Sequence, residues 1–311
     1  MAHPRRFRFG IQLATAPSAA EWKALARKAE DLGYSTLFMP DHFGDQLAPA
    51  PALATAAAAT TELRIGALVF DNDYRHPLVL AKELATLDLL SDGRLEVGLG
   101  AGWMRSDYDE SGIAYDAPAT RVDRFEEGLQ VIKGLLGPDP VTFEGDHYTI
   151  TGHQGLPKPV QATPPVLIGG GMKRMLSIAG RHADIVGINP TIPNGAIDAD
   201  AARNGLAEAT DEKIGWVRAA AGDRYDDLEI NLLNFACIVT DDRASMIESF
   251  APAFGMSPAE LSAMPHALVG SVDELCEQLE ERRDRFDASY VVVQGDALDT
   301  FAPVVARLSG N

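Results

Sequence analysis

The sequence predicts a (β/α)8 barrel that forms a single domain over residues 1–311. Three observations support this fold class. Short apolar runs alternate with amphipathic stretches along nearly the whole chain, which is typical of a parallel sheet covered by helices. Eight strand candidates in 311 residues fit the size of this barrel, and no linker rich in Pro, Gly or Ser divides them. A doubly wound open sheet is the alternative architecture.

The predicted strands are runs of apolar and β-branched residues that end at polar or turn-forming residues. They span residues 7–14, 35–40, 63–70, 94–100, 164–170, 183–188, 228–240 and 289–294. A hairpin over 140–150, with its turn at 144–146, interrupts the alternation. We therefore expect insertions into the barrel near 138–163 and over 189–227.

Helices are predicted where apolar residues recur every three to four positions. In the helix over 18–33, Ser18 is the expected N-cap because Glu21 follows three residues later, and Gly33 is the expected end. The helix over 77–93 begins with Pro77, a favoured first-turn residue. The other predicted helices span 50–61, 120–137, 172–182, 196–221, 242–254, 271–286 and 298–308.

Composition excludes several classes of partner. The formal net charge of −18 disfavours nucleic acid and anionic membrane surfaces, and no Lys/Arg run offsets it. No stretch approaches the roughly 20 apolar residues of a membrane helix. The first ten residues are basic and lack a following apolar segment, so we expect no secretory signal and a cytoplasmic location. Cys237 and Cys276 lack zinc-site spacing, which predicts reduced thiols and no metal site.

The active site of such a barrel lies at the carboxyl ends of its strands. Asp41 and His42 follow the second predicted strand, residues 71–76 (DNDYRH) the third, and Asn189 the sixth. Adjacent strand residues point to opposite faces, so Asp41 and His42 should not pair with each other unless the chain has already turned. His42 is either a structural residue at the strand end or a proton-transfer group.

Two glycine-rich segments also follow strands. GLGAGW (98–103) resembles a dinucleotide fingerprint, but Trp103 stands where GxGxxG requires glycine. Its glycines indicate either a tight strand exit or close approach of the backbone to a ligand. LIGGGMKRM (167–175) places three glycines before a helix whose free N–H groups suit a phosphate, with Lys173 and Arg174 adding charge. A flexible loop with solvated basic residues is the alternative.

Together these stretches resemble the luciferase-like monooxygenase superfamily, and within it the coenzyme F420-dependent oxidoreductases. The resemblance covers nearly the whole chain. It rests on MPDHF (39–43), YRHPLVLAKELATLDLLSDGRLEVGLGAGW (74–103), PPVLIGGG (164–171), ALVGSVDELCEQLEERRDRF (267–286) and FAPVVARL (301–308).

The resemblance implies the barrel independently and places a cofactor across its mouth. Asp41 and His42 would line the ring pocket, and a non-prolyl cis peptide would fall between Ala67 and Val69, behind the ring. The cofactor-binding residues that the resemblance implies are Asp41, Ala67, Leu68, Val69, Gly100, Ala101, Gly102, Ser106, Gly169, Gly170 and Gly171. His42 would be the catalytic residue. Gln46 and the loop ATAP (14–17) depart from the sugar-phosphate dehydrogenase branch, so glucose 6-phosphate is not the expected substrate.

The expected activity is hydride transfer between F420 and a small organic substrate. His42 would move the accompanying proton or stabilise charge on the substrate oxygen, and Asp41 would hydrogen-bond the ring edge or hold the loop. An FMN-dependent monooxygenase is the second hypothesis, and a non-catalytic flavin or F420 binder is the third. We also expect a homodimer through apolar faces of the helices near 77–91 and 120–136. Arg75, Arg105 and Arg121 are candidates to receive an anionic substrate, or are surface and salt-bridge residues.

Overall fold

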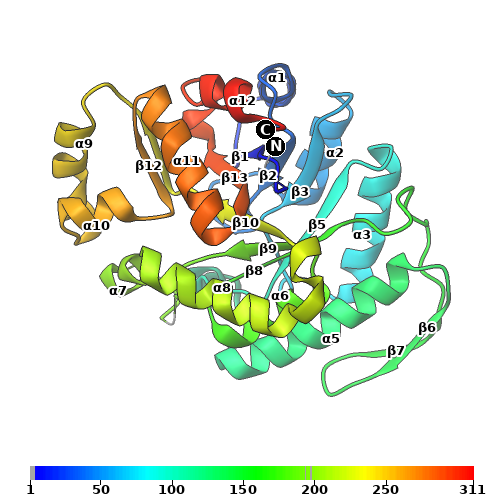
Figure 1. Ribbon diagram of the computed structural model, residues 1–311. Coiled ribbons are helices and arrows are strands. Elements are labelled where there is room, and N and C mark those ends of the chain that lie inside the picture. The colour runs from blue at the N-terminus through cyan, green and yellow to red at the C-terminus, as the bar shows by residue number, and fades with distance from the viewer. Residues whose placement is uncertain (1–3, 193, 197) are drawn as a thin grey trace.

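The structure is a computed structural model that describes residues 4–192, 194–196 and 198–311. Eight strands, all paired in parallel, form a closed barrel surrounded by helices (Figure 1). The barrel strands are β1 (Arg8–Gln12), β2 (Thr36–Met39), β3 (Arg64–Ala67), β5 (Leu95–Gly100), β8 (Val166–Gly170), β9 (Ile185–Ile188), β10 (Glu229–Leu233) and β13 (Ala288–Gln294). They neighbour one another in chain order, and the β1–β13 pairing closes the ring. The predicted barrel is confirmed, and the open sheet is excluded.

The helices that follow the strands pack on the outside of the barrel. They are α1 (Ala19–Asp31), α2 (Pro49–Ala57), α3 (Pro77–Leu90), α5 (Pro118–Leu136), α6 (Lys173–His182), α8 (Ala207–Ala221), α11 (Val272–Phe286) and α12 (Ala302–Leu308). Ser18 caps α1 by accepting a hydrogen bond from the backbone N–H of Glu21, and Pro77 is the first residue of α3. The prediction of these two helix starts from Ser18 and Pro77 is therefore confirmed. Among the described residues, none of the helices combines the length and apolarity that a bilayer crossing needs.

The remaining elements decorate the barrel. They are β4 (Phe70–Asp71), α4 (Arg105–Ser111), β6 (Val141–Glu144), β7 (Thr149–His153), α7 (Ala199–Arg203), η1 (Gly222–Asp227), β11 (Ala236–Val239), α9 (Arg243–Phe250), η2 (Ala251–Phe254), α10 (Pro258–Ala263), β12 (Ala267–Gly270) and η3 (Gly295–Ala297). The β6–β7 hairpin matches the predicted one. Within 189–227, α8 packs beside α6 in the helical ring. Figure 1 shows α9, α10 and β12 at one side of the barrel, away from α3 and α5.

The single strand predicted over 228–240 is two strands. β10 stays in the barrel, whereas β11 pairs with β12 in a separate two-stranded sheet. The backbone N–H of Asn234 still donates to Val292 of β13, but the next N–H, that of Phe235, donates to His266. The chain therefore leaves the barrel between residues 234 and 235, a change of partner that an unbroken apolar run does not reveal.

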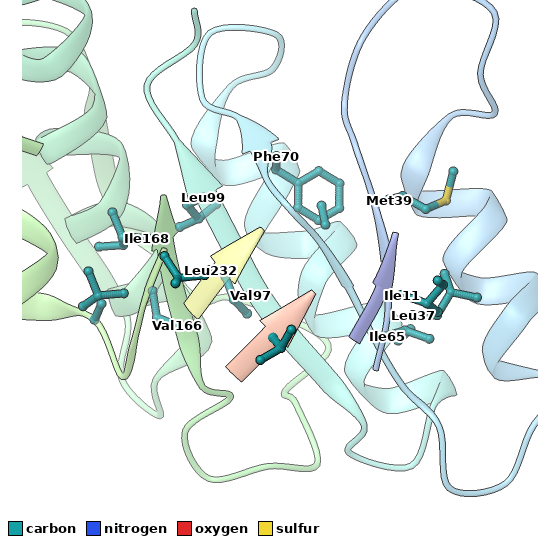
Figure 2. Packing of buried hydrophobic residues seen from close by; sticks show 14 of the residues in the cluster. Ile11, Leu37, Met39, Ile65, Phe70, Val97, Leu99, Val166, Ile168 and Leu232 are labelled. Carbon is teal, nitrogen blue, oxygen red and sulfur yellow. The ribbon is translucent and has the colours of Figure 1, made fainter. Parts of the chain in front are cut away.

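Neighbouring residues of the barrel strands serve two cores. Ile11, Leu37 and Ile65 point outward and pack against the helices (Figure 2). Phe38, next to Leu37 in β2, lies in the inner cluster with Tyr290. This alternation follows from the pleat of a strand, and it fills the interior of the barrel with side chains rather than leaving a pore.

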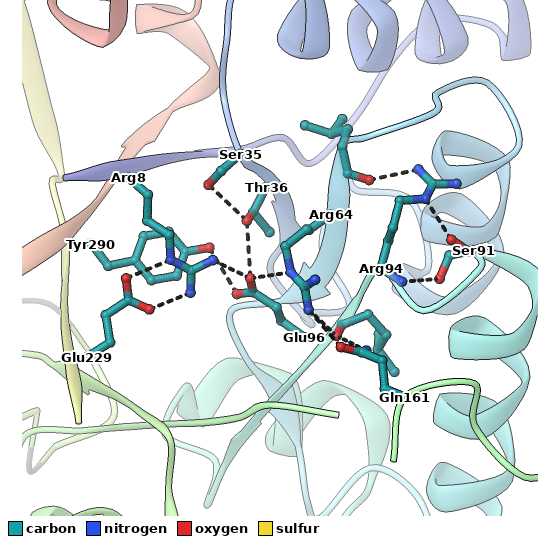
Figure 3. A network of polar contacts seen from close by, with 12 residues as sticks. Arg8, Ser35, Thr36, Arg64, Ser91, Arg94, Glu96, Gln161, Glu229 and Tyr290 are labelled. Carbon is teal, nitrogen blue, oxygen red and sulfur yellow. Dashed lines mark hydrogen bonds and ion pairs between the residues drawn. The ribbon is translucent and has the colours of Figure 1, made fainter. Parts of the chain in front are cut away.

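A buried carboxylate, that of Glu96 in β5, ties several strands together inside the barrel (Figure 3). One of its oxygens, Oε1, accepts hydrogen bonds from Arg8 and from Nε of Arg64, the latter at 2.8 Å. The hydroxyl of Thr36 also donates to Oε1, and the hydroxyl of Tyr290 donates to Oε2 at 3.0 Å. These partners belong to β1, β3, β2 and β13, so one side chain links five of the eight barrel strands.

We predict that Glu96→Leu lowers the free energy of unfolding by about 3–5 kcal/mol, because it removes a buried charge and leaves Arg8 and Arg64 without it. The control is Asp299→Asn, which breaks the exposed Lys28–Asp299 pair and should cost less than about 1 kcal/mol. Urea unfolding of both variants measures the difference. Equal losses would show that the buried carboxylate does not hold the barrel together.

Candidate active site

A cavity of about 430 Å³ lies at the carboxyl ends of the barrel strands. This is the end at which barrels of this type place their active sites, and the volume is in the range of small-molecule sites. Segments that follow β2, β5, β8, β9 and β10 all contribute to its wall. Residues far apart in the sequence therefore meet there because their strands run in parallel.

Most of the residues singled out in the sequence meet in this wall. They are Asp41, His42, Leu68, Val69, Gly100, Ala101, Gly102, Gly169, Gly170 and Gly171. Two others do not line the cavity: Ala67 is fully buried in β3, and Ser106 is exposed on α4. The expectation that residues at the carboxyl ends of the strands meet therefore holds for most of these residues. The role of each residue depends on its contacts.

The backbone after β3 forms a bulge at the floor of the cavity. The peptide bond between Leu68 and Val69 is cis, within the segment where it was expected. A Cβ atom at position 98 would lie 1.8 Å from the carbonyl oxygen of Ala67, and one at position 100 would lie 2.5 Å from Cγ2 of Val69. Gly98 and Gly100 are therefore required because they make room for the bulge, an explanation that the sequence did not suggest.

His42 is paired with a buried carboxylate. Its Nδ1 lies 2.6 Å from Oδ2 of Asp107, which also accepts a hydrogen bond from the hydroxyl of Tyr74. Because Asp107 holds Nδ1, the other ring nitrogen, Nε2, is left for a bound molecule. The indole of Trp103 stands edge-on to the imidazole at 5.6 Å. Asp107 was not predicted, since the polar sequence of α4 gives no helical signal and the pair spans 65 residues.

Asp41 binds protein groups on either side of its carboxylate. Both of its oxygens accept from Arg75, at 2.7 and 3.1 Å, and Oδ2 also accepts from the backbone N–H of Asp71. Asp41 therefore holds the loop after β4, which was one of its two expected roles, and Arg75 is a salt-bridge partner. Strand β2 ends at Met39, so the chain has turned before Asp41 and His42, and both residues line the cavity.

Asp71 is a buried carboxyl group in the cavity wall. Burial above all, together with the negative charges of Asp73 and Asp41, raises the pKa of Asp71 to about 7, against hydrogen bonds from the Asp73 backbone and from Tyr108 that lower it. A Cβ atom at position 102 would overlap the Tyr108 hydroxyl and the Asp71 carboxyl, and Gly102 has a φ of +76°. Glycine at 102 thus allows the β5 exit to pass against this acidic group.

Arg121 brings a positive charge to the cavity and, among the described residues, forms no close ion pair, although its charge lowers the pKa of nearby Asp73. It lies in the first turns of α5, is 6% exposed and lines the cavity. Its guanidinium carbon lies 4.1 Å from the centre of the Tyr115 ring and 5.8 Å from that of Tyr108. Its Nε and Nη1 atoms are buried and find no hydrogen-bond partner among the residues that the structure describes. Buried unsatisfied donors are rare, so this group is suited to an anion in the cavity.

Other basic residues near the site are engaged elsewhere. Arg174, expected to add charge to the glycine loop, instead pairs with Asp123 and Glu126 of α5. Arg105 pairs with Asp109, one turn along α4. Within the described part of the chain, no group of three or more His, Cys, Asp and Glu is arranged to hold a metal ion. Of the three arginines considered as anion receptors, Arg121 therefore has the geometry of one.

Comparison with known proteins agrees with the expected family. Residues 5–302 match the luciferase-like monooxygenase family. An F420-dependent glucose-6-phosphate dehydrogenase of Amycolatopsis mediterranei is 31% identical over 167 residues, which is 51% of this chain and 50% of the relative. An FMNH2-dependent dimethylsulfone monooxygenase of Pseudomonas fluorescens is 32% identical over 127 residues, 41% of this chain and 34% of the relative.

The fold is shared with a solved structure, the coenzyme F420-dependent tetrahydromethanopterin reductase of Methanopyrus kandleri. The TM-score is 0.75 at 20% sequence identity, with 98% of this chain and 100% of that chain covered. This similarity supports the barrel and its connections. Relatives named for F420 and for FMN both occur, so the comparisons leave the choice of cofactor open.

The raised pKa of Asp71 predicts a specific pH dependence of stability. A folded-state pKa of about 7, against the ordinary 3.8, means that folding favours the protonated carboxyl. This stabilising contribution is complete below pH 3.8 and is lost as the pH rises to about 7. We expect the stability of the wild type to fall, relative to that of Asp71→Asn, between about pH 4 and pH 8. Urea unfolding at several pH values measures this.

The exposed Asp45→Asn serves as the control and should follow the wild type at every pH. Parallel curves for the wild type and Asp71→Asn would show that Asp71 does not titrate near neutral pH.

Proposed function

Because the chain belongs to the luciferase-like monooxygenase family, we propose that it is an oxidoreductase that transfers a hydride between coenzyme F420 and a small organic substrate. Members of this family are oxidoreductases or monooxygenases. The observation that carries the proposal is that the His42–Asp107 pair and the unpartnered guanidinium of Arg121 line one cavity. The first is a proton-transfer group, and the second suits a phosphorylated ligand.

The cavity wall fits a phosphorylated cofactor on two counts. Arg121 lacks a partner for Nε and Nη1, and a phosphate has oxygens to accept from both. Gly100–Gly102 and Gly169–Gly171 bring backbone to the cavity surface where side chains would otherwise stand. We propose that these groups hold the phosphate and that Leu68 and Val69 support the ring. When bound, F420 supplies a two-electron carrier that gives or takes a hydride.

The chain itself would contribute a proton-transfer group, His42, held in position at the cavity. Asp107 accepts from Nδ1 of His42 and so sets the ring orientation, which leaves Nε2 free to give or take the proton at the substrate oxygen. Asp41 and Arg75 hold the neighbouring loop in place, which keeps His42 at the cavity.

F420 is favoured over FMN by residues 72–77 (NDYRHP) and 100–103 (GAGW), which resemble the F420-dependent branch. The second candidate is an FMN-dependent monooxygenase, supported by the identity with the Pseudomonas relative. Both cofactors carry a phosphate, so the fit at Arg121 does not distinguish them. A flavin activates O2, whereas the deazaflavin ring does not sustain that chemistry, so the choice of cofactor decides the reaction class.

Titration with both cofactors tests the proposal. We expect F420 to bind more tightly than FMN, followed by quenching of fluorescence or by calorimetry. Arg121→Met should weaken F420 binding about 10- to 100-fold, because hydrogen bonds to charged groups contribute about 1.5–3 kcal/mol. Arg105→Met is the matched control, since Arg105 is exposed and pairs with Asp109. The affinity of this variant for F420 should equal that of the wild type. Preference for FMN would overturn the choice of cofactor, and binding of neither would overturn the function.

Substitution of His42 tests whether it moves a proton. With a substrate found by following F420 absorbance, His42→Ala should lower kcat about 10²- to 10⁴-fold, the usual contribution of a general acid or base. Asp107→Asn should lower kcat less and should shift the pH profile, since it acts through the imidazole. His153→Ala, on the exposed β7 strand, is the control. Unchanged turnover in His42→Ala would make His42 a wall residue and favour a binding protein.

We also propose a homodimer formed through α3. Val79, Leu89 and Leu90 of this helix are 44–62% exposed, and Val160 is 56% exposed. Val160 lies beside the end of α3, because its backbone N–H donates to Asp88. Exposed apolar side chains gathered in this way are typical of an interface. Sedimentation velocity tests this, and a single species at the chain mass of 33.3 kDa would exclude it.

A further inference from the structure

The cavity has two chemically different halves. The charged and titratable residues Asp41, His42, Asp71 and Arg121 come from segments after β2, β3 and β5. The opposite side of the barrel, from the ends of β9 and β10 onward, supplies mostly apolar residues, with Asn189 and Thr191 as polar residues after β9. The apolar residues are Ile192, Leu233, Phe235, Phe254, Leu261 and Met264. Most of these belong to the segment that carries α9 and α10, which stands at one side of the barrel in Figure 1.

His266 is a polar residue within this apolar half. It lines the cavity, is completely buried and packs against the ring of Phe235 at 5.5 Å. Its Nδ1 lies 3.0 Å from the backbone oxygen of Leu233. A carbonyl oxygen accepts only, so Nδ1 carries the proton and Nε2 is left as an acceptor. Nε2 is buried, and no residue in the described part of the chain forms a hydrogen bond with it.

The surroundings of His266 keep the imidazole neutral and offer nothing to an anion. Burial above all, together with the positive charges of Lys213 and Arg282, lowers the pKa of His266 to about 4, against the hydrogen bond to the backbone oxygen of Leu233, which raises it. Lys213 donates to the side chain of Asn204 and to backbone oxygens. Arg282 donates to the side chain of Asn234 and to backbone oxygens. Both cations are therefore already engaged by neutral oxygens.

We propose that the apolar half of the cavity binds an uncharged substrate with an apolar body and a single hydrogen-bond donor, a hydroxyl or an N–H, that Nε2 of His266 accepts. The substrate would thereby satisfy a buried acceptor that the protein leaves unpaired, while its body covers Phe235, Leu261 and Met264. This inference names the substrate class of the proposed enzyme and rests on that function for the reaction. Binding of a probe molecule does not depend on it.

A matched set of probes tests the inference. The probes are 2-naphthol, 2-methoxynaphthalene, which lacks the donor, and 2-naphthoate, which is charged. We expect the wild type to prefer 2-naphthol to 2-methoxynaphthalene about fivefold, the ratio that one hydrogen bond of about 1 kcal/mol produces, and to bind 2-naphthoate least. His266→Phe should remove the preference while 2-methoxynaphthalene still binds. His266→Gln, which keeps an acceptor, should retain part of the preference.

His153→Phe is the control for the substitution, since His153 is exposed on β7, and it should keep the full preference. Circular dichroism shows whether each variant is folded. If His266→Phe does not fold, the comparison of His266→Gln with the wild type still tests the inference. Equal binding of 2-naphthol and 2-methoxynaphthalene by the wild type, or an unchanged preference in a folded His266→Phe, overturns the inference. F420 binding to the wild type is measured in the same series. A naphthol preference without F420 binding would overturn the proposed function and leave this inference standing.

Discussion

The carboxylate of Glu96 is the contact on which the arrangement of the barrel depends. It is completely buried, and its partners Arg8, Thr36, Arg64 and Tyr290 come from four other strands (Figure 3). A buried charge has to be surrounded by donors, so these strands must run side by side in one register. The partners Arg8, Thr36 and Arg64 are the first residues of their strands, whereas the cavity lies at the carboxyl ends.

The architecture was predictable because it repeats. Apolar alternation located all eight barrel strands, and capping residues located helix starts such as that at Ser18. Prediction failed where one apolar run serves two sheets, as at 228–240, because the exit from the barrel depends on whether Val292 or His266 accepts the next N–H. It also failed for α4, whose residues are almost all polar. In both cases the structure depends on hydrogen-bond partners that are distant in the sequence, so the local sequence pattern does not reveal it.

The candidate site was predictable to the same degree and for the same reason. His42 and the glycines follow strands, so the general rule for parallel barrels collects them at one end. Asp107 and the unpartnered atoms of Arg121 were beyond reach, because their importance lies in what they contact or lack. The glycines within β5 are an example. Gly98 and Gly100 were interpreted either as a tight strand exit or as close approach of the backbone to a ligand, and the structure adds that they make room for Ala67 and Val69.

The division of the cavity explains why a cofactor could be proposed from sequence while the substrate could not. The polar half is built from segments after β2, β3 and β5, and two of the stretches that carry the resemblance, 39–43 and 74–103, lie there. The apolar half is built from the segments after β9 and β10, which carry extra helices. These segments pack through apolar side chains and contain no recognisable sequence motif. An apolar wall tolerates many sequences as long as its volume is filled. Under the proposed function, changes at residues such as Leu261 and Met264 would alter the substrate side of the cavity without disturbing His42 or Arg121.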